Sequence, residues 1–141
     1  MAAFKSKEEF VEVFEKLWQL IEVHPKVGPD LKKAQAPHRF TFTDLDLEFN
    51  VTFSEEEGRN LRWCWGREEC DWEPVVSLEM NSETANKYFQ GKENVMMAVT
   101  FGRIKLSGPM STILKLAPVT RPVESDYREM LASEGRDHLV L

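Results

Sequence analysis

The spacing of apolar residues changes near residue 39, and this change limits the fold more than any single motif. Upstream, Phe10, Phe14 and Leu17 recur at the spacing of one face of an α-helix. Downstream, the segments 39–43 and 45–53 alternate apolar and polar residues, as a strand with one buried face does. A helix followed by strands in so short a chain predicts an α+β fold.

The first helix has a recognisable beginning and end. Ser6 and Glu9 form a capping-box pattern, in which the two side chains satisfy free amide groups at the start of a helix. Pro25 disfavours helical geometry at His24, so the helix is expected to stop there. A short second helix is expected near 29–35.

Three further segments complete the strands of a predicted sheet. Residues 61–65 follow a turn at 55–60, residues 76–80 follow a polar loop, and residues 102–108 alternate between glycines. The connections between the first four strands are short. Short connections favour antiparallel neighbours, so we expect these strands to lie antiparallel.

Four more helices are expected after residue 80, at 82–89, 94–99, 110–116 and 123–132. Asn81 or Ser82 can cap the first of these, which ends before Gly91 as helices commonly do. Pro109 suits the start of the third. The last residues, 134–141, are expected to form a loose tail.

The length and the net charge of the chain limit the kinds of partner and the location that we expect for it. The chain has 141 residues, 42% of them apolar and 30% charged, which suits one globular domain over 1–141 with its core at 4–133. The net charge of −6 repels phosphate polymers, so nucleic acid is not expected as a partner. No apolar run reaches membrane-spanning length, which predicts no stable membrane insertion. An acidic N-terminal segment without a secretory signal predicts a cytoplasmic location.

The cysteines and histidines do not form the pattern of a metal site. In a reducing compartment, two thiols at the spacing of Cys64 and Cys70 are more often free than bridged, so we expect free thiols. His24, His38 and His138 lie in separate segments without the spaced partners of a zinc site. No metal and no other cofactor is therefore expected.

The sequence also lacks the short motifs of common catalytic sites. It contains no nucleophile elbow, phosphate loop or dinucleotide-binding glycine motif, so we do not expect an enzyme. A basic cluster has two interpretations: it binds the head group or phosphates of an acyl-CoA, or it is a solvated polar face. Its members are Lys87, Lys92, Arg103 and Lys105.

The order of motifs in the C-terminal half carries a family resemblance. The motifs are SETANKYFQGK at 82–92, MMAVTF at 96–101, GRIKLSGPM at 102–110 and LKL at 114–116. Two helices, a basic and apolar strand, a glycine and a further helix follow one another in this order. In this part the chain resembles the sterol carrier protein type-two family of small lipid-binding domains.

The resemblance implies both a fold and a ligand. Members of this family have a five-stranded, mostly antiparallel sheet covered by helices, with an apolar tunnel between the sheet and the C-terminal helices. They bind fatty acids, fatty acyl-CoA, sterols or phospholipids without a cofactor. Non-catalytic binding or transfer of such an apolar ligand is therefore the function expected for this chain.

The residues expected to line the tunnel are apolar and come from the sheet and the C-terminal half. Methionines suit ligands of irregular shape because their unbranched side chains adapt. In an alternative interpretation the same side chains fill the core, and the chain is an interaction or accessory module, either a homodimer or the partner of an acyl-transfer enzyme. The expected lining is Phe49, Val51, Trp63, Leu78, Met80, Tyr88, Phe89, Met96, Met97, Phe101, Ile104, Leu106, Met110, Ile113 and Leu114.

Overall fold

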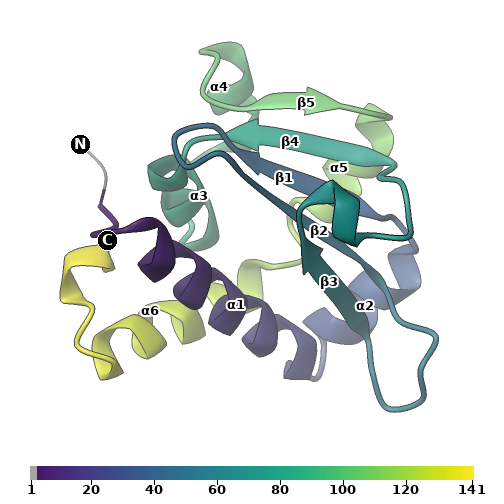
Figure 1. The fold of residues 1–141 in the computed structure, drawn as a ribbon, viewed down its shortest axis with the longest axis horizontal. Helices are drawn as coiled ribbons and strands as arrows, with labels where there is room; N and C mark the ends of the chain where they lie inside the picture. Colours follow the sequence, from purple (N-terminus) through teal and green to yellow (C-terminus); the bar gives the residue numbers. More distant parts are fainter. Residues whose placement is uncertain (1–2) are drawn as a thin grey trace.

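One five-stranded sheet with helices packed against it organises residues 3–141, the part of the chain that the computed structural model describes (Figure 1). Residues 1 and 2 of the predicted span 1–141 lie outside the described residues. The strands are β1 (His38–Phe42), β2 (Leu47–Phe53), β3 (Leu61–Trp65), β4 (Val76–Met80) and β5 (Lys105–Ser107). The helices are α1 (Lys7–Val23), α2 (Val27–Ala34), α3 (Ser82–Phe89), α4 (Val95–Thr100), α5 (Met110–Leu116) and α6 (Glu124–Ser133), with 3-10 turns η1 (Arg67–Glu69), η2 (Arg121–Val123) and η3 (Asp137–Leu139). The predicted α+β arrangement with five strands is confirmed.

The sheet is mixed, with the strand order β3-β2-β1-β4-β5. Antiparallel pairing joins β1 to β2, β2 to β3 and β4 to β5, but β1 and β4 run parallel. The central parallel pair corrects the expectation of a mostly antiparallel sheet. The β2–β3 hairpin occupies one edge of β1, and β4 therefore joins the other edge, where Val75 and Val76 donate main-chain hydrogen bonds to the Pro37 carbonyl.

Helix α1 packs its apolar face on the sheet and begins and ends where the sequence predicts. The Ser6 hydroxyl accepts a hydrogen bond of 3.0 Å from the Glu9 amide, and the helix stops at Val23, before Pro25. Each aromatic ring pair adds about 0.5–1.5 kcal/mol to the free energy of unfolding beyond the burial of its area. On the buried face of α1, the Phe14 ring contacts the rings of Phe40, Phe42 and Phe49.

The C-terminal tail packs against α3, so the expectation of a loose tail at 134–141 is wrong. Leu139 is fully buried. Its carbonyl accepts hydrogen bonds from Asn86 Nδ2 at 2.9 Å and from Gln90 Nε2 at 2.8 Å. Both partners lie far from the tail in the sequence, so the polar composition of the tail gave no sign of them.

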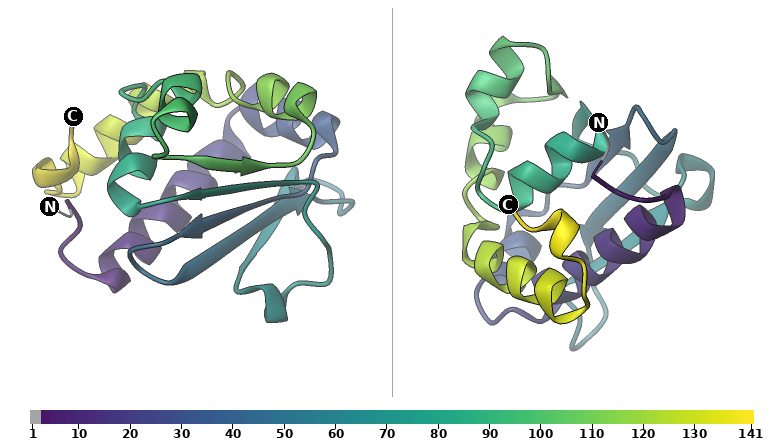
Figure 2. Two further views of the ribbon diagram at one scale, coloured as in Figure 1. Left: turned by 90° about the horizontal axis from the view of Figure 1, so that it is seen from above. Right: turned by 90° about the vertical axis from the view of Figure 1, so that its left-hand side faces the viewer.

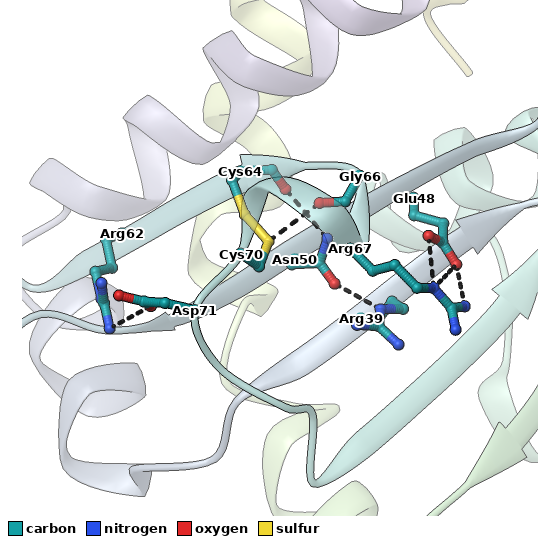
Figure 3. The surroundings of a disulfide bond; sticks show 9 residues. All are labelled: Arg39, Glu48, Asn50, Arg62, Cys64, Gly66, Arg67, Cys70 and Asp71. Carbon is teal, nitrogen blue, oxygen red and sulfur yellow. Dashed lines mark hydrogen bonds and ion pairs between the residues drawn. A yellow bond between two sulfur atoms is a disulfide. The ribbon is translucent and has the colours of Figure 1, made fainter.

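The two cysteines form a disulfide bond, so the expectation of free thiols is also wrong (Figure 3). Cys64 lies in β3, and Cys70 follows the turn η1. Between them, Gly66 has a φ of 83°, a left-handed value that glycine adopts without a Cβ clash, and the chain turns back there. The Cα atoms of the two cysteines are 6.2 Å apart, within the range that a disulfide spans.

Two elements differ in length from the prediction. Helix α2 begins at Val27 rather than near residue 29. Strand β5 is shorter than the predicted segment 102–108, because Gly102 lies in a turn with a φ of 77° and only residues from Lys105 onward pair with β4. The other helices begin and end within a few residues of the predicted positions.

Candidate functional site

A small apolar cavity lies between the sheet and the helices, with a volume of about 40 Å³. Its floor comes from the parallel strands β1 and β4, whose register pairs His38 with Val76 and Phe40 with Leu78. Helices cover this floor. The covering residues are Trp18, Leu31, Tyr88, Phe89, Val95, Ile113, Leu116, Ala117 and Thr120.

A larger cleft of about 550 Å³ opens beside this inner cavity. On one side the cleft is bounded by the end of α3 and the start of α4, and on the other by α5 and η2. Its lining is more polar than that of the inner cavity. The lining residues are Tyr88, Gly91, Lys92, Glu93, Asn94, Val95, Met96, Ile113, Leu114, Ala117, Pro118, Thr120, Arg121 and Glu124.

The outer cleft and the inner cavity share a wall. Five residues line both of them: Tyr88, Val95, Ile113, Ala117 and Thr120. The Tyr88 hydroxyl donates a hydrogen bond of 3.2 Å to the carbonyl of Ala117, which joins α3 to the end of α5 across this wall.

The polar groups that border the inner cavity are uncharged. Burial lowers the pKa of His38, so its imidazole is neutral near pH 7. His38 Nδ1 lies 2.9 Å from the Ala36 carbonyl, and a neutral ring that donates this bond leaves Nε2 as an acceptor. The indole Nε1 of Trp18 is buried and has no hydrogen-bond partner among the described residues. The residues that border the cavity thus include polar groups but none with a full charge near pH 7.

Charged side chains gather instead at the outer cleft. Lys92 and Arg121 contribute positive charge, and Glu93 and Glu124 contribute negative charge. Burial raises the pKa of the Glu124 carboxyl, against the opposing effect of Arg128 and Arg121. Because charge is confined to the cleft, an amphipathic ligand would find polar partners outside the wall and apolar surface inside it.

The structure distributes the predicted lining residues over four environments. Leu78, Tyr88, Phe89 and Ile113 border the inner cavity, and Met96 and Leu114 border the cleft, as Tyr88 and Ile113 also do. Phe49, Val51, Met80 and Ile104 are buried in the core, while Trp63 and Leu106 are half-buried against it. Met97, Phe101 and Met110 are exposed and line neither space.

Sequence reasoning missed nine residues of the inner cavity. For His38, Phe40 and Val76 the reason is topological, because the pairing of β1 with β4 brings them together and no sequence signal indicates that pairing. Trp18 could have been predicted, because it follows Phe14 at helical spacing on the face of α1 that covers the sheet. The missed residues are Trp18, Leu31, His38, Phe40, Val76, Val95, Leu116, Ala117 and Thr120.

Within residues 3–141, neither a cluster of metal-ligating side chains nor a membrane-spanning helix is present. No three His, Cys, Asp or Glu side chains are grouped so that they could hold a metal ion. None of the helices in this part of the chain combines the length and the apolar character needed to cross a bilayer.

The model of the SCP-2 sterol transfer family matches residues 14–121. The chain belongs to this family. Membership of the SCP-2 family indicates lipid binding or transfer as the function and an apolar lipid as the ligand. No curated protein matches the chain.

Solved structures show the same fold. The UbiJ-SCP2 ubiquinone synthesis protein is similar with a TM-score of 0.60 and 11% identity, over 82% of this chain and 95% of that one. The sterol carrier protein domain 2 of Helicoverpa armigera gives a TM-score of 0.58 and 21% identity, over 81% and 89% of the two chains. Identities this low support the shared SCP-2 fold alone.

Larger enzymes also contain a similar part. The stereoselective inverting sec-alkylsulfatase Pisa1 from Pseudomonas sp. is similar with a TM-score of 0.54 and 15% identity, over 65% of this chain. The similar region is only 14% of the alkylsulfatase, so this SCP-2 chain spans about a seventh of that enzyme's length.

Proposed function

We propose that this SCP-2 family protein binds or transfers an apolar lipid without making or breaking a covalent bond. The ligand classes are fatty acids, fatty acyl-CoA, sterols and phospholipids. The observation that carries the proposal is the shared wall, because five residues line both an open cleft of about 550 Å³ and an apolar cavity of about 40 Å³ under the helices. Sequestration needs a dry, well-shaped space and no catalytic group.

The ligand would enter by displacing the wall. The inner cavity, at about 40 Å³, is far below the 300–1,000 Å³ that ligand pockets commonly have, so a lipid requires α5 to shift with Ile113 and Ala117. Burial of each methylene supplies about 0.8 kcal/mol toward the free energy of binding. A chain of several methylenes therefore offsets the loss of a few contacts between α5 and α3.

The charges define how the ligand would lie. A charged head group has no charged partner in the inner cavity and would lose its hydration there, which is costly. It would therefore stay in the cleft beside Lys92 and Arg121, with the apolar part inside. The buried N–H of Trp18 is available to an uncharged ligand oxygen, such as that of a hydroxyl group.

The small volume of the inner cavity also favours a second candidate function. If α5 does not shift, the side chains fill the core and the SCP-2 fold serves as an interaction or accessory module, for example beside an acyl-transfer enzyme. In that case no lipid enters, and the outer cleft is a surface feature only.

Mass spectrometry of the native protein, followed by organic extraction, tests the proposal. The protein is examined as purified and after incubation with a fatty acid, an acyl-CoA, a sterol and a phospholipid. Ala117→Trp places a large ring in the wall and should abolish binding, whereas Ser111→Trp adds the same ring at an exposed position of α5 outside both spaces and should leave binding unchanged. Circular dichroism checks that both variants fold.

The lipid-binding proposal is overturned if the wild-type protein binds none of the four lipids. If Ala117→Trp binds them as the wild type does, the ligand lies elsewhere, and the proposed position of the ligand behind the shared wall is overturned.

A further inference from the structure

Positive charge is concentrated in one segment of an acidic protein. The segment 90–121, here called the basic segment, contains five Lys or Arg residues and one Glu, for a net charge of +4. The whole chain has a net charge of −6, so the residues outside the basic segment carry −10. Charge is therefore distributed unevenly along the chain, and an anionic surface would attract the basic segment more than the remainder.

Exposed apolar side chains gather in the same segment. Of the nine large hydrophobic residues that are exposed within residues 3–141, five belong to it, on α4, at the end of α4 and on α5. Phe101 is 66% exposed, which is unusual for a phenylalanine. The five residues, here called the apolar rim, are Met96, Met97, Phe101, Met110 and Leu114.

Two residues of the apolar rim line the cleft. Figure 2 (left) shows α4 and α5 on one side of β5, with the chain after α5 returning toward α4. Met96 of α4 and Leu114 of α5 line the cleft from two different helices, whereas Met97, Phe101 and Met110 are exposed and lie outside its lining. If the side chains of the apolar rim entered a lipid phase, the cleft would lie next to that phase.

Cations lie among the rim residues. Lys92 and Arg121 line the cleft itself, and Lys105 and Lys115 are exposed on β5 and α5. Arg103 donates a 2.8 Å hydrogen bond to Glu93, the one acidic residue of the basic segment, so this pair is neutral together. The net positive charge of the basic segment therefore comes from its lysines and Arg121, while outside the segment Glu79 lies opposite Lys105 in the sheet and Glu124 lines the cleft with Arg121.

We propose that the basic segment docks this protein on the surface of an anionic lipid bilayer. The apolar rim enters the interface, the lysines meet the anionic head groups, and the cleft opens toward the lipid. Two weak attractions act together here, since each exposed apolar side chain gains by burial and each cation gains from the negative surface potential. The inference extends the proposed lipid binding, because it supplies the route by which a ligand passes between membrane and cleft.

Sedimentation with vesicles tests the docking. Phosphatidylcholine vesicles with and without phosphatidylserine are compared at low and high salt. The wild-type protein should sediment with the anionic vesicles, bind the neutral vesicles weakly, and dissociate at high salt because the charges are screened.

Two charge-reversal variants distinguish the effect of the basic segment on vesicle binding from the effect of the protein's net charge. The triple variant Lys92→Glu, Lys105→Glu, Lys115→Glu should lose at least about tenfold in affinity for anionic vesicles. The matched triple Lys5→Glu, Lys7→Glu, Lys33→Glu changes net charge equally at exposed positions outside the basic segment and should stay within about twofold of the wild type. Equal losses in the two triples would overturn the inference.

Replacement of an exposed apolar side chain by serine provides a second test, because such a substitution changes the stability of the fold little. Phe101→Ser should weaken vesicle binding, whereas Val23→Ser, at a position that is 75% exposed on α1, should not. If vesicle binding is absent while native mass spectrometry still finds bound lipid, the docking inference fails alone. If vesicles bind and no lipid is ever found in the protein, the proposed function fails alone.

Discussion

The side-chain amide of Asn86 donates a 2.9 Å hydrogen bond to the main-chain carbonyl of Leu139, which joins α3 to the C-terminal turn η3. The Gln90 amide donates to the same carbonyl, and the Tyr127 hydroxyl donates to Asn86 Oδ1. All these groups are buried, so each bond is protected from competition with water. The end of the chain is therefore part of the structural core beneath α3.

Truncation of Leu139 should reveal how much this anchor contributes. Leu139→Ala is expected to lower the free energy of unfolding by about 2–5 kcal/mol, because it removes buried methyl groups and leaves a cavity. Denaturation by urea measures the change. Val140→Ala, at a neighbouring position that is 36% exposed, should change the free energy by less than about 0.5 kcal/mol. If the tail were loose, neither variant would change the free energy of unfolding appreciably.

The disulfide should contribute measurably to stability. Bonding of residues six apart in sequence restricts the unfolded chain, and loop entropy of that size corresponds to about 2 kcal/mol. Reduction by dithiothreitol should lower the free energy of unfolding by this amount, while the double variant Cys64→Ser, Cys70→Ser should not respond to the reductant. Two free thiols in freshly isolated, unreduced protein would contradict the bond. They would also favour the predicted cytoplasmic location, where thiols are kept reduced.

Acid should destabilise the protein through His38. Burial lowers the pKa of His38 from 6.5, so at mildly acidic pH the unfolded chain binds a proton at this residue that the folded protein does not. The free energy of unfolding should therefore fall as the pH drops below about 6.5, by at most about 1.4 kcal/mol per pH unit. Urea titrations between pH 7 and pH 5 measure the slope. His38→Phe removes the titrating group, and an unchanged slope in this variant would show that other groups cause the effect.

Local signals predicted the elements well because each depends on a few neighbouring residues. Ser6 and Pro25 bound α1, and Asn81 caps α3 with its side chain on the Thr84 amide. The wrong predictions share one cause. Each concerns a contact between residues that the fold or a turn brings together. The pairing of β1 with β4, the docking of Leu139 on α3 and the closure of Cys64 on Cys70 all need three-dimensional information that no local pattern holds.

The error in topology explains how the candidate site differed from expectation. The predicted lining contained no residue of β1. In the structure β1 is the central strand, and its residues His38 and Phe40 form half of the cavity floor. Apolar character predicted which side chains avoid water in general. It did not separate those that border a space, such as Ile113, from those that fill the core, such as Phe49, or that face outward, such as Phe101.

The hydrogen bond between the Tyr88 hydroxyl and the Ala117 carbonyl should control how often the wall opens. Tyr88→Phe keeps the ring in the wall and removes the hydroxyl, which bonds the Ala117 carbonyl and also interacts with Thr120. The segment that contains α5 should then separate from α3 more readily, at a cost of about 1 kcal/mol in stability. Amide hydrogen exchange in α5 should become faster, and a bound lipid should dissociate faster. Tyr127→Phe is the matched control, because it removes a hydroxyl that donates to Asn86, away from the wall. That control should lower global stability without selective exchange in α5. If both variants change α5 exchange alike, opening of the wall is global unfolding, and α5 is not a gate.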